Sequence, residues 1–244
     1  MKYLILYSYY ETSNSIFNLN FFIKNALSKN TGVNFIFLIN SNKCSVNIPT
    51  NFNVKIIKRN NSGLDFGAWS DGLKQVDIND YDNFIFINDT VIGPFLPRYI
   101  KNDWYVLFCN LLDSRTKLSG LTINYKPFND TKLSKHVQSM MFCTDKVGLT
   151  TLISKKIFLD TKYNSLNKLD YIINYEIGMS KIILESGYQI TALALSENKK
   201  HNIIDVWFFL NKYFNMNINP LETIFYKNNR IKTPIYNLYI SHFF

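Results

Sequence analysis

The hydrophobic positions in the first part of the chain predict alternating strands and helices. Residues 15–28 carry apolar side chains at intervals of three and four, the spacing of a helix that packs on a core. A second helix is expected around residues 67–75. Short apolar runs, which are typical of buried strands, cover residues 2–8, 33–39, 53–58 and 83–88. Strands that alternate with helices indicate βαβ units and a mostly parallel sheet whose strands end at one common edge.

The second half of the chain has a less regular pattern. Helical spacing predicts helices over residues 168–186 and 203–213. Apolar runs predict further strands at residues 104–109, 137–143 and 188–195. No internal repeat and no linker is visible, so we predict a single α/β domain over residues 1–244, with helices flanking the sheet.

The composition is that of a globular protein with a basic surface. Apolar residues make up 47% of the chain, and 27 Lys and Arg against 18 Asp and Glu give a formal charge of +9. The basic residues are scattered, and the densest clusters are short, for example Lys227 with Arg230. Such clusters are either solvated surface or sites for a phosphate-bearing partner, and both interpretations stay open.

Cysteine usage and the N-terminal sequence favour a cytoplasmic protein. The three cysteines show no CxxC spacing, so neither a disulfide framework nor a zinc site is expected. The apolar start is interrupted at Ser8 and Glu11, too early for a signal peptide, and no run approaches the ~18 apolar residues of a membrane span. Any membrane contact would therefore be peripheral.

The first candidate motif lies between the run at residues 53–58 and the helix that follows it. Asn61, Gly63 and Asp65 form a turn in which Gly63 permits a positive φ or a close backbone approach. A helix N-terminus favours an anion such as a diphosphate, and Asp65 could accept hydrogen bonds from sugar hydroxyls. Alternatively, Asp65 only caps the helix.

The second candidate motif is Asn88-Asp89-Thr90, at the end of an apolar run. A buried strand would bring Asp89 to the ligand-binding edge of the sheet. Mn²⁺ and Mg²⁺ are commonly held by one or two carboxylates together with phosphate oxygens. The alternative is an Asp in the turn before Gly93-Pro94.

The third candidate is Glu176, which lies in a stretch of isoleucines within a predicted helix. A carboxylate among apolar residues tends to be paired or functional, and it could serve as a general base. The alternative is an exposed Glu that pairs with a lysine such as Lys181.

The order of these motifs resembles that of inverting glycosyltransferases with the GT-A fold. In that pattern an Asn-x-Gly turn precedes a helix, a strand ends in a DxD-type metal motif, and an acidic pair comes before a Gly-Tyr. The closer resemblance is to the rhamnan-synthesis F-like branch of bacterial polysaccharide clusters and large DNA viruses. It rests on residues 61–73 and 83–96, on Gln138-Ser139, and on residues 219–222.

The resemblance implies a GT-A fold and transfer of a sugar, rhamnose or another hexose or deoxyhexose, from a nucleotide donor to a glycan hydroxyl with inversion. Residues 1–100 would bind the nucleotide sugar and residues 101–244 the acceptor. Glu176 would be the base. The donor-binding set would be Tyr7, Asn61, Gly63, Asp65, Asn88 and Asp89.

The metal motif departs from the family pattern, because Asn88 and Thr90 stand where DxD has its two aspartates. Asp89 would then hold Mn²⁺ or Mg²⁺ with help from His201 or His136. The acidic pair is reduced to Glu176, since Tyr175 takes the other position.

Two other classes remain open from the sequence. The charge and the many aromatic residues permit a nucleic-acid-binding module, although the diffuse charge and the lack of a known motif mean that no nucleic-acid partner is expected. The altered metal motif permits a non-catalytic domain that only binds a nucleotide or a partner. The sequence does not reveal the oligomeric state.

Overall fold

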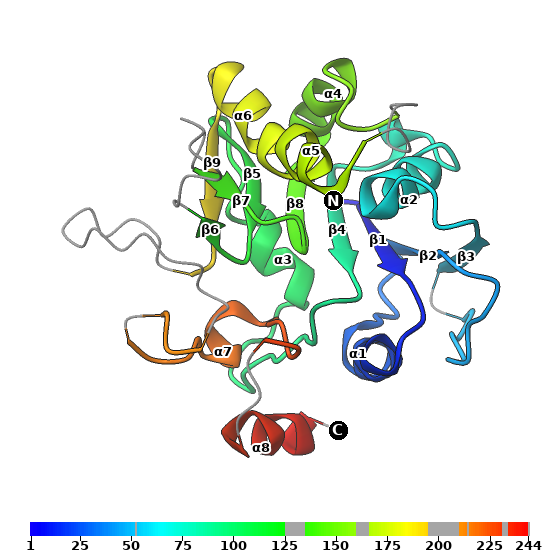
Figure 1. Cartoon of the computed structure of the whole chain (residues 1–244), viewed down its shortest axis with the longest axis vertical. Coiled ribbons are helices and arrows are strands. Elements are labelled where there is room, and N and C mark those ends of the chain that lie inside the picture. The colour runs from blue at the N-terminus through cyan, green and yellow to red at the C-terminus, as the bar shows by residue number, and fades with distance from the viewer. Residues whose placement is uncertain are drawn as a thin grey trace.

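The computed structural model describes residues 1–51, 53–124, 135–159, 166–194, 210–213, 215–230 and 234–243. A seven-stranded sheet forms the centre of the molecule, in the order β3-β2-β1-β4-β8-β5-β9 (Figure 1). Its strands are β1 (Tyr3–Tyr9), β2 (Val33–Ile39), β3 (Val54–Lys58), β4 (Asn83–Asn88), β5 (Thr116–Gly120), β8 (Met141–Asp145) and β9 (Gln189–Ala192). β8 is antiparallel to both of its neighbours, and the other pairs are parallel. The prediction of a mostly parallel sheet is therefore confirmed.

Helices cover both faces of this sheet, as Figure 1 shows. One face carries α2 (Leu64–Leu73), α4 (Lys146–Ser154), and a continuous helical stretch made of α5 (Lys168–Tyr171), the π-helix η3 (Ile172–Ile177) and α6 (Gly178–Glu185). The other face carries α1 (Ser13–Ala26) and α3 (Trp104–Cys109). Smaller elements are the 3₁₀ turn η1 (Ile78–Asp80), the hairpin β6 (Ile123–Asn124) with β7 (His136–Val137), α7 (Pro220–Thr223) and α8 (Pro234–Phe243).

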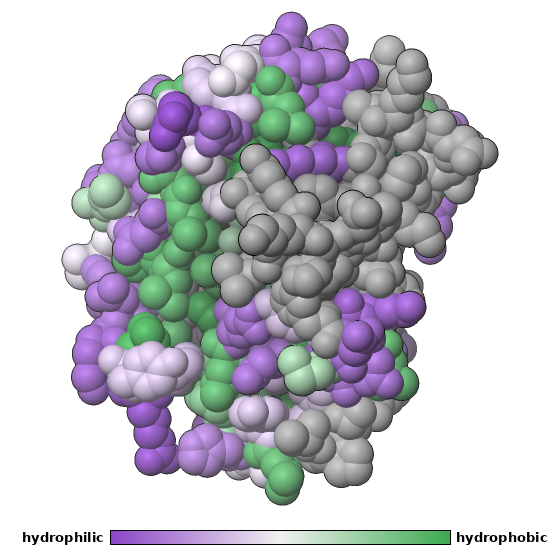
Figure 2. All heavy atoms as spheres, turned by 90° about the vertical axis from the view of Figure 1, so that its left-hand side faces the viewer, coloured by the Kyte–Doolittle hydropathy of each residue, from purple (hydrophilic) through white to green (hydrophobic). Residues whose placement is uncertain are grey.

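The alternation of side chains along β1 divides the core into two layers. Ile5 and Tyr7 face the layer under α1 and α3, whereas Leu4 and Leu6 face the layer under α2 and α4. Every residue of β1 is buried, which explains why polar and apolar residues do not alternate along this strand. Figure 2 shows the side of the molecule at the left of Figure 1, where a band of hydrophobic residues lies among hydrophilic ones. None of the helices in the described ranges is long and apolar enough to cross a bilayer.

Three element predictions were wrong in part. Residues 104–109 form helix α3, because the buried positions Trp104, Tyr105, Phe108 and Cys109 repeat at helical spacing within a run that is apolar throughout. The predicted strand 137–143 is divided between β7 and β8 by a turn at residues 139–140. Of the predicted helix 203–213, residues 203–209 lie outside the described part, and residues 210–213 form a turn and a β-bridge instead.

The segment after α7 returns to the loop that follows β4. Ile92 and Tyr226 form an antiparallel bridge, with N–H to O distances of 2.9 and 3.1 Å. Phe95 N also donates to Ile224 O at 2.7 Å. Residues from late in the chain are thereby fixed beside the end of a central strand.

Candidate active site

A cleft of about 760 Å³ opens where β1, β2 and β4 end and where the antiparallel β8 begins. Its size is within the range of small-molecule sites. Three carboxylates and three cationic side chains line it: Asp65, Asp89, Glu176, Lys168, Lys227 and Arg230. The parallel topology explains this clustering, because loops that follow neighbouring strands meet at one edge.

A chain of hydrogen bonds fixes Asp65 at the floor of the cleft. Ser8 Oγ donates to Asp65 Oδ1 at 2.7 Å, and Asn88 Nδ2 donates to Asp65 Oδ2 at 2.9 Å. Asn40 Nδ2 in turn donates to Ser8 Oγ at 2.9 Å, and Arg59 Nη1 donates to Asn40 Oδ1 at 2.5 Å. Burial raises the pKa of Asp65, although the hydrogen bonds from Ser8 and Asn88 favour its ionised form.

Asp65 does not cap α2. Gly63 is the N-cap residue, with φ of 70°, so the expected positive φ is confirmed. The first turn of α2 is partly closed to a ligand, because Phe66 N donates to the Tyr171 hydroxyl at 2.9 Å. The same hydroxyl donates to Gly63 O at 3.1 Å, so α5 holds the turn in place.

Asp89 directly follows β4 and lies beside Asp65. Its Oδ2 accepts a hydrogen bond of 2.6 Å from Tyr10 N. Its pKa is raised to about 7, first by burial and then by the negative charge of Asp65, against the opposing hydrogen bond from Tyr10. A buried carboxylate whose ionised form is disfavoured by a second negative group is a place that a cation would stabilise.

Glu176 reaches the cleft from the π-helical turn η3. Ser139 Oγ donates to its Oε2 at 2.6 Å, and His136 Nε2 lies 3.9 Å from its Oε1. π-helical turns inside α-helices are frequent at functional sites, since the extra residue shifts which side chains face inward. The alternative that pairs Glu176 with Lys181 does not hold, because Lys181 pairs with Glu185 at 3.7 Å.

Tyr7 does not line the cleft, which corrects the expectation that it contacts the donor. Its side chain is 1% exposed, and its ring packs on Phe22 and Phe37 at centroid distances of 4.8 and 5.6 Å. The odd positions of β1 point into one core layer, so an aromatic residue there cannot stack on a ligand at the strand's end. The neighbouring aromatic residue Trp69, on α2, is also completely buried, so it is not available to a ligand either.

The other predicted donor residues lie at the cleft, and one predicted metal ligand cannot be placed. Asn61 and Asn88 line the cleft, and Gly63 comes directly before the lining residues Leu64 and Asp65. His201 lies outside the described residues. His136 is buried beside Glu176.

The residues around Asp89 fit a divalent cation held mainly by a substrate. Within the described ranges, no three His, Cys, Asp or Glu side chains gather into a metal cage. Mg²⁺ and Mn²⁺ often use one or two carboxylates plus the phosphates of a substrate, and Asp89 with the neighbouring Asp65 offers that donor set.

Lys227, Arg230 and Ser139 were not predicted as site residues. The first two appeared only as a short basic cluster, and Ser139 only as part of the resemblance. Lys227 and Arg230 reach the cleft because the bridge between Ile92 and Tyr226 brings their segment to the end of β4.

The mostly parallel sheet, with helices on both faces and a charged cleft at its edge, is an α/β domain of the GT-A class. The family model for Rhamnan synthesis protein F matches residues 35–214, and the chain belongs to this family.

Among the individual proteins that resemble the chain are a virulence protein and a mannosyltransferase. Virulence protein VirA of Vibrio anguillarum (strain ATCC 68554 / 775) is 27% identical over 143 residues, which cover 56% of this chain and 41% of that protein. The chain therefore corresponds to less than half of this relative's length. A structure of mannosyltransferase PcManGT from Pyrobaculum calidifontis, in complex with GDP-Man and Mn²⁺, aligns with a TM-score of 0.50. It shares 9% identity and covers 81% of this chain and 58% of that one, so the likeness is one of fold.

Proposed function

We propose that this protein is a glycosyltransferase that moves a sugar from a nucleoside-diphosphate donor to a hydroxyl of a glycan. The observation that carries the proposal is the arrangement of carboxylates in one cleft. Glu176, oriented by Ser139, lies on the η3 side of the cleft, Asp65 lies in the first turn of α2, and Asp89 directly follows β4. Membership of the rhamnan synthesis family and the fold of a mannosyltransferase support the same chemistry.

In the proposed reaction, Glu176 takes the proton of the acceptor hydroxyl as that oxygen attacks the anomeric carbon. A new C–O bond forms on one face of the sugar, and the bond to the diphosphate breaks on the other, which inverts the configuration. The electron pair of the broken bond goes to the diphosphate oxygen. Ser139 donates to one oxygen of Glu176, leaving the other to receive the proton.

Asp65 is proposed to hold the donor by accepting hydrogen bonds from its ribose, with Asn61 nearby. Asp89 would hold Mn²⁺ or Mg²⁺. Such an ion, when bound, offsets negative charge on the departing diphosphate. In this proposal residues 1–100 bind most of the donor and residues 101–244 bind the acceptor. Rhamnose, or another hexose or deoxyhexose, is the proposed sugar, from the family's description.

The decisive experiment measures release of nucleoside diphosphate from a panel of nucleotide sugars, including GDP-mannose and dTDP-rhamnose, with and without Mn²⁺. We expect release from one donor and loss of that release in Asp89→Ala. If every donor is inert yet a nucleotide still raises the melting temperature, the alternative holds, namely a binding domain on a GT-A fold without turnover.

A further inference from the structure

Lys227 is a partly buried cation that lines the cleft and has no role in the proposed reaction as described above. Within the described part of the chain, its ammonium group makes no hydrogen bond or ion pair. Its pKa is lowered to about 8 by burial and by the nearby Arg230, while Glu176 and Asp65 partly restore it. Keeping a cation in such a place is unfavourable unless an anion joins it.

The backbone that carries Lys227 is held firmly on both sides. The preceding residue, Tyr226, forms the bridge to Ile92. The following residue, Asn228, donates from Nδ2 to Asn18 Oδ1 at 2.7 Å. Asn18 Nδ2 in turn donates to the carbonyl oxygen of Asp89 at 2.8 Å. The position of Lys227 is therefore coupled, through the side chains of Asn228 and Asn18, to the backbone of Asp89.

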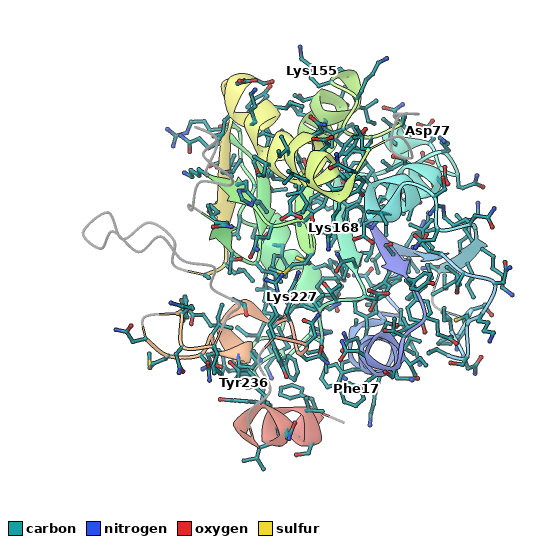
Figure 3. All side chains as sticks on the ribbon, viewed as in Figure 1. Phe17, Asp77, Lys155, Lys168, Lys227 and Tyr236 are labelled. Atoms are coloured by element: carbon teal, nitrogen blue, oxygen red, sulfur yellow. The ribbon has the colours of Figure 1, made fainter. Side chains whose placement is uncertain are left out.

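The donor diphosphate of the proposed reaction is an anion that enters a cleft lined partly by negative side chains. The cleft already holds the carboxylates of Asp65, Asp89 and Glu176, which would repel an anionic ligand. The positive side chains at the cleft are Lys168, Lys227 and Arg230. Lys168 is exposed at the start of α5, whereas Lys227 is half-buried, and Figure 3 labels both near the middle of the view.

We propose that Lys227, assisted by Arg230, binds the diphosphate of the donor and neutralises the charge that develops on it as the sugar departs. This inference rests on the proposed function and adds specific residues to it. A lysine can supply this charge as a point contact, and an arginine can add a bidentate contact to phosphate oxygens. The consequence is that a diphosphate binds to this cleft even when no divalent metal is present.

Inorganic pyrophosphate is the probe, because it tests the diphosphate site without knowledge of the sugar or the base. Its dissociation constant is measured by calorimetry in EDTA for the wild type, Lys227→Met, Lys227→Arg and Lys155→Met. Lys155 is an exposed lysine at the outer end of α4, far from Lys227 in Figure 3, and serves as the matched control. We expect Lys227→Met to bind ~10-fold or more weakly, Lys227→Arg to bind within ~3-fold of the wild type, and Lys155→Met to be unchanged.

Arg230→Gln provides a second variant on a more exposed residue, in case Lys227→Met does not fold. We expect it to weaken pyrophosphate binding by a few-fold. The inference is overturned if Lys227→Met binds pyrophosphate as tightly as the wild type, or if the wild type binds it only when Mn²⁺ is added.

Failure of this inference is distinguishable from failure of the proposed function. One distinguishing result is that the wild type releases nucleoside diphosphate while Lys227→Met binds pyrophosphate normally. That result would support the glycosyltransferase activity and show that Lys227 does not bind the diphosphate. Pyrophosphate binding that depends on Lys227, without turnover of any donor, would leave an anion site on a protein that is not a transferase.

Discussion

Asn88 Nδ2 donates a hydrogen bond of 2.9 Å to Asp65 Oδ2, joining the end of β4 to the first turn of α2. The contact explains why an amide is favourable at a position where a DxD motif has a carboxylate. An aspartate at residue 88 would face Asp65 at hydrogen-bonding distance, and two carboxylates there cannot both stay ionised without a cation or a shared proton.

The first prediction tests this relationship with Asn88→Asp. In EDTA we expect the variant to lose about 1–3 kcal/mol of stability, because a hydrogen bond is replaced by repulsion between two carboxylates. Mn²⁺ should reverse the loss and bind more tightly than it binds to the wild type. Melting temperatures across a Mn²⁺ titration measure both effects. Asn79→Asp, at an exposed residue, is the control, and equal responses of the two variants would contradict the interpretation.

The second prediction concerns Glu176 as the base. Glu176→Gln keeps the size and the acceptor oxygen for Ser139 but cannot take a proton. We expect kcat to fall ~10²–10⁴-fold while the dissociation constant of the donor changes little. Glu185→Gln, at an exposed residue of the same helical stretch, should keep wild-type kcat. Undiminished turnover in Glu176→Gln would exclude this residue as the base.

The third prediction follows from the raised pKa of Asp89. Its pKa is about 7 in the folded protein against an ordinary value of 3.8, so the folded state retains a proton that the unfolded state releases between about pH 4 and pH 7. Stability therefore falls as the pH rises through this interval. In EDTA at pH 8, Asp89→Asn should be more stable than the wild type by about 1–2 kcal/mol, a rise in Tm of ~2–6 °C.

The advantage of Asp89→Asn should vanish below about pH 4, where the carboxyl is protonated in both states. Thermal melts from about pH 3 to about pH 8 provide the measurement, and Asp80→Asn, at an exposed aspartate, is the control. A difference between Asp89→Asn and the wild type that is constant with pH would show that the charge of Asp89 is not the cause.

The fourth prediction concerns the buried hydroxyl of Tyr7, which has no hydrogen-bond partner among the described residues. Tyr7→Phe removes an unsatisfied polar group, so we expect a gain of about 1 kcal/mol and unchanged donor binding. Tyr105→Phe is the matched comparison, because its hydroxyl donates to Asp103 at 2.7 Å, and its loss should be destabilising by about 1 kcal/mol. Denaturant unfolding measures both. If Tyr7→Phe bound the donor more weakly than the wild type, the hydroxyl of Tyr7 would have a role in donor binding.

Hydrophobic spacing predicted the first half of the fold well, because β1, β2 and β4 are mostly apolar runs bounded by polar turns. The positions of Asp65 and Asp89 at the sheet edge followed from that topology. The same spacing failed for residues 104–109, where every residue is apolar and periodicity carries no information.

Local sequence patterns could not predict contacts between residues that are far apart in the sequence. Lys227 looked like surface charge, since nothing near it in sequence indicates that the segment forms a bridge with Ile92. The contact between Ser139 and Glu176 spans 37 residues and depends on the π-helical turn, which no sequence signal announced.

Asn14 Nδ2 donates a hydrogen bond of 3.0 Å to Asn228 Oδ1, and the two residues are 214 positions apart in the sequence. This separation has a consequence for the synthesis of the protein. At ~5–20 residues per second, a ribosome needs roughly 10–40 s to synthesise the intervening chain. Throughout that time the growing polypeptide can form β1, α1 and β4 but lacks the strand partner of Ile92. The nascent chain thus acquires Asp65 and Asp89 early and Lys227 and Arg230 much later, so the cleft is complete only after residue 230 has been synthesised.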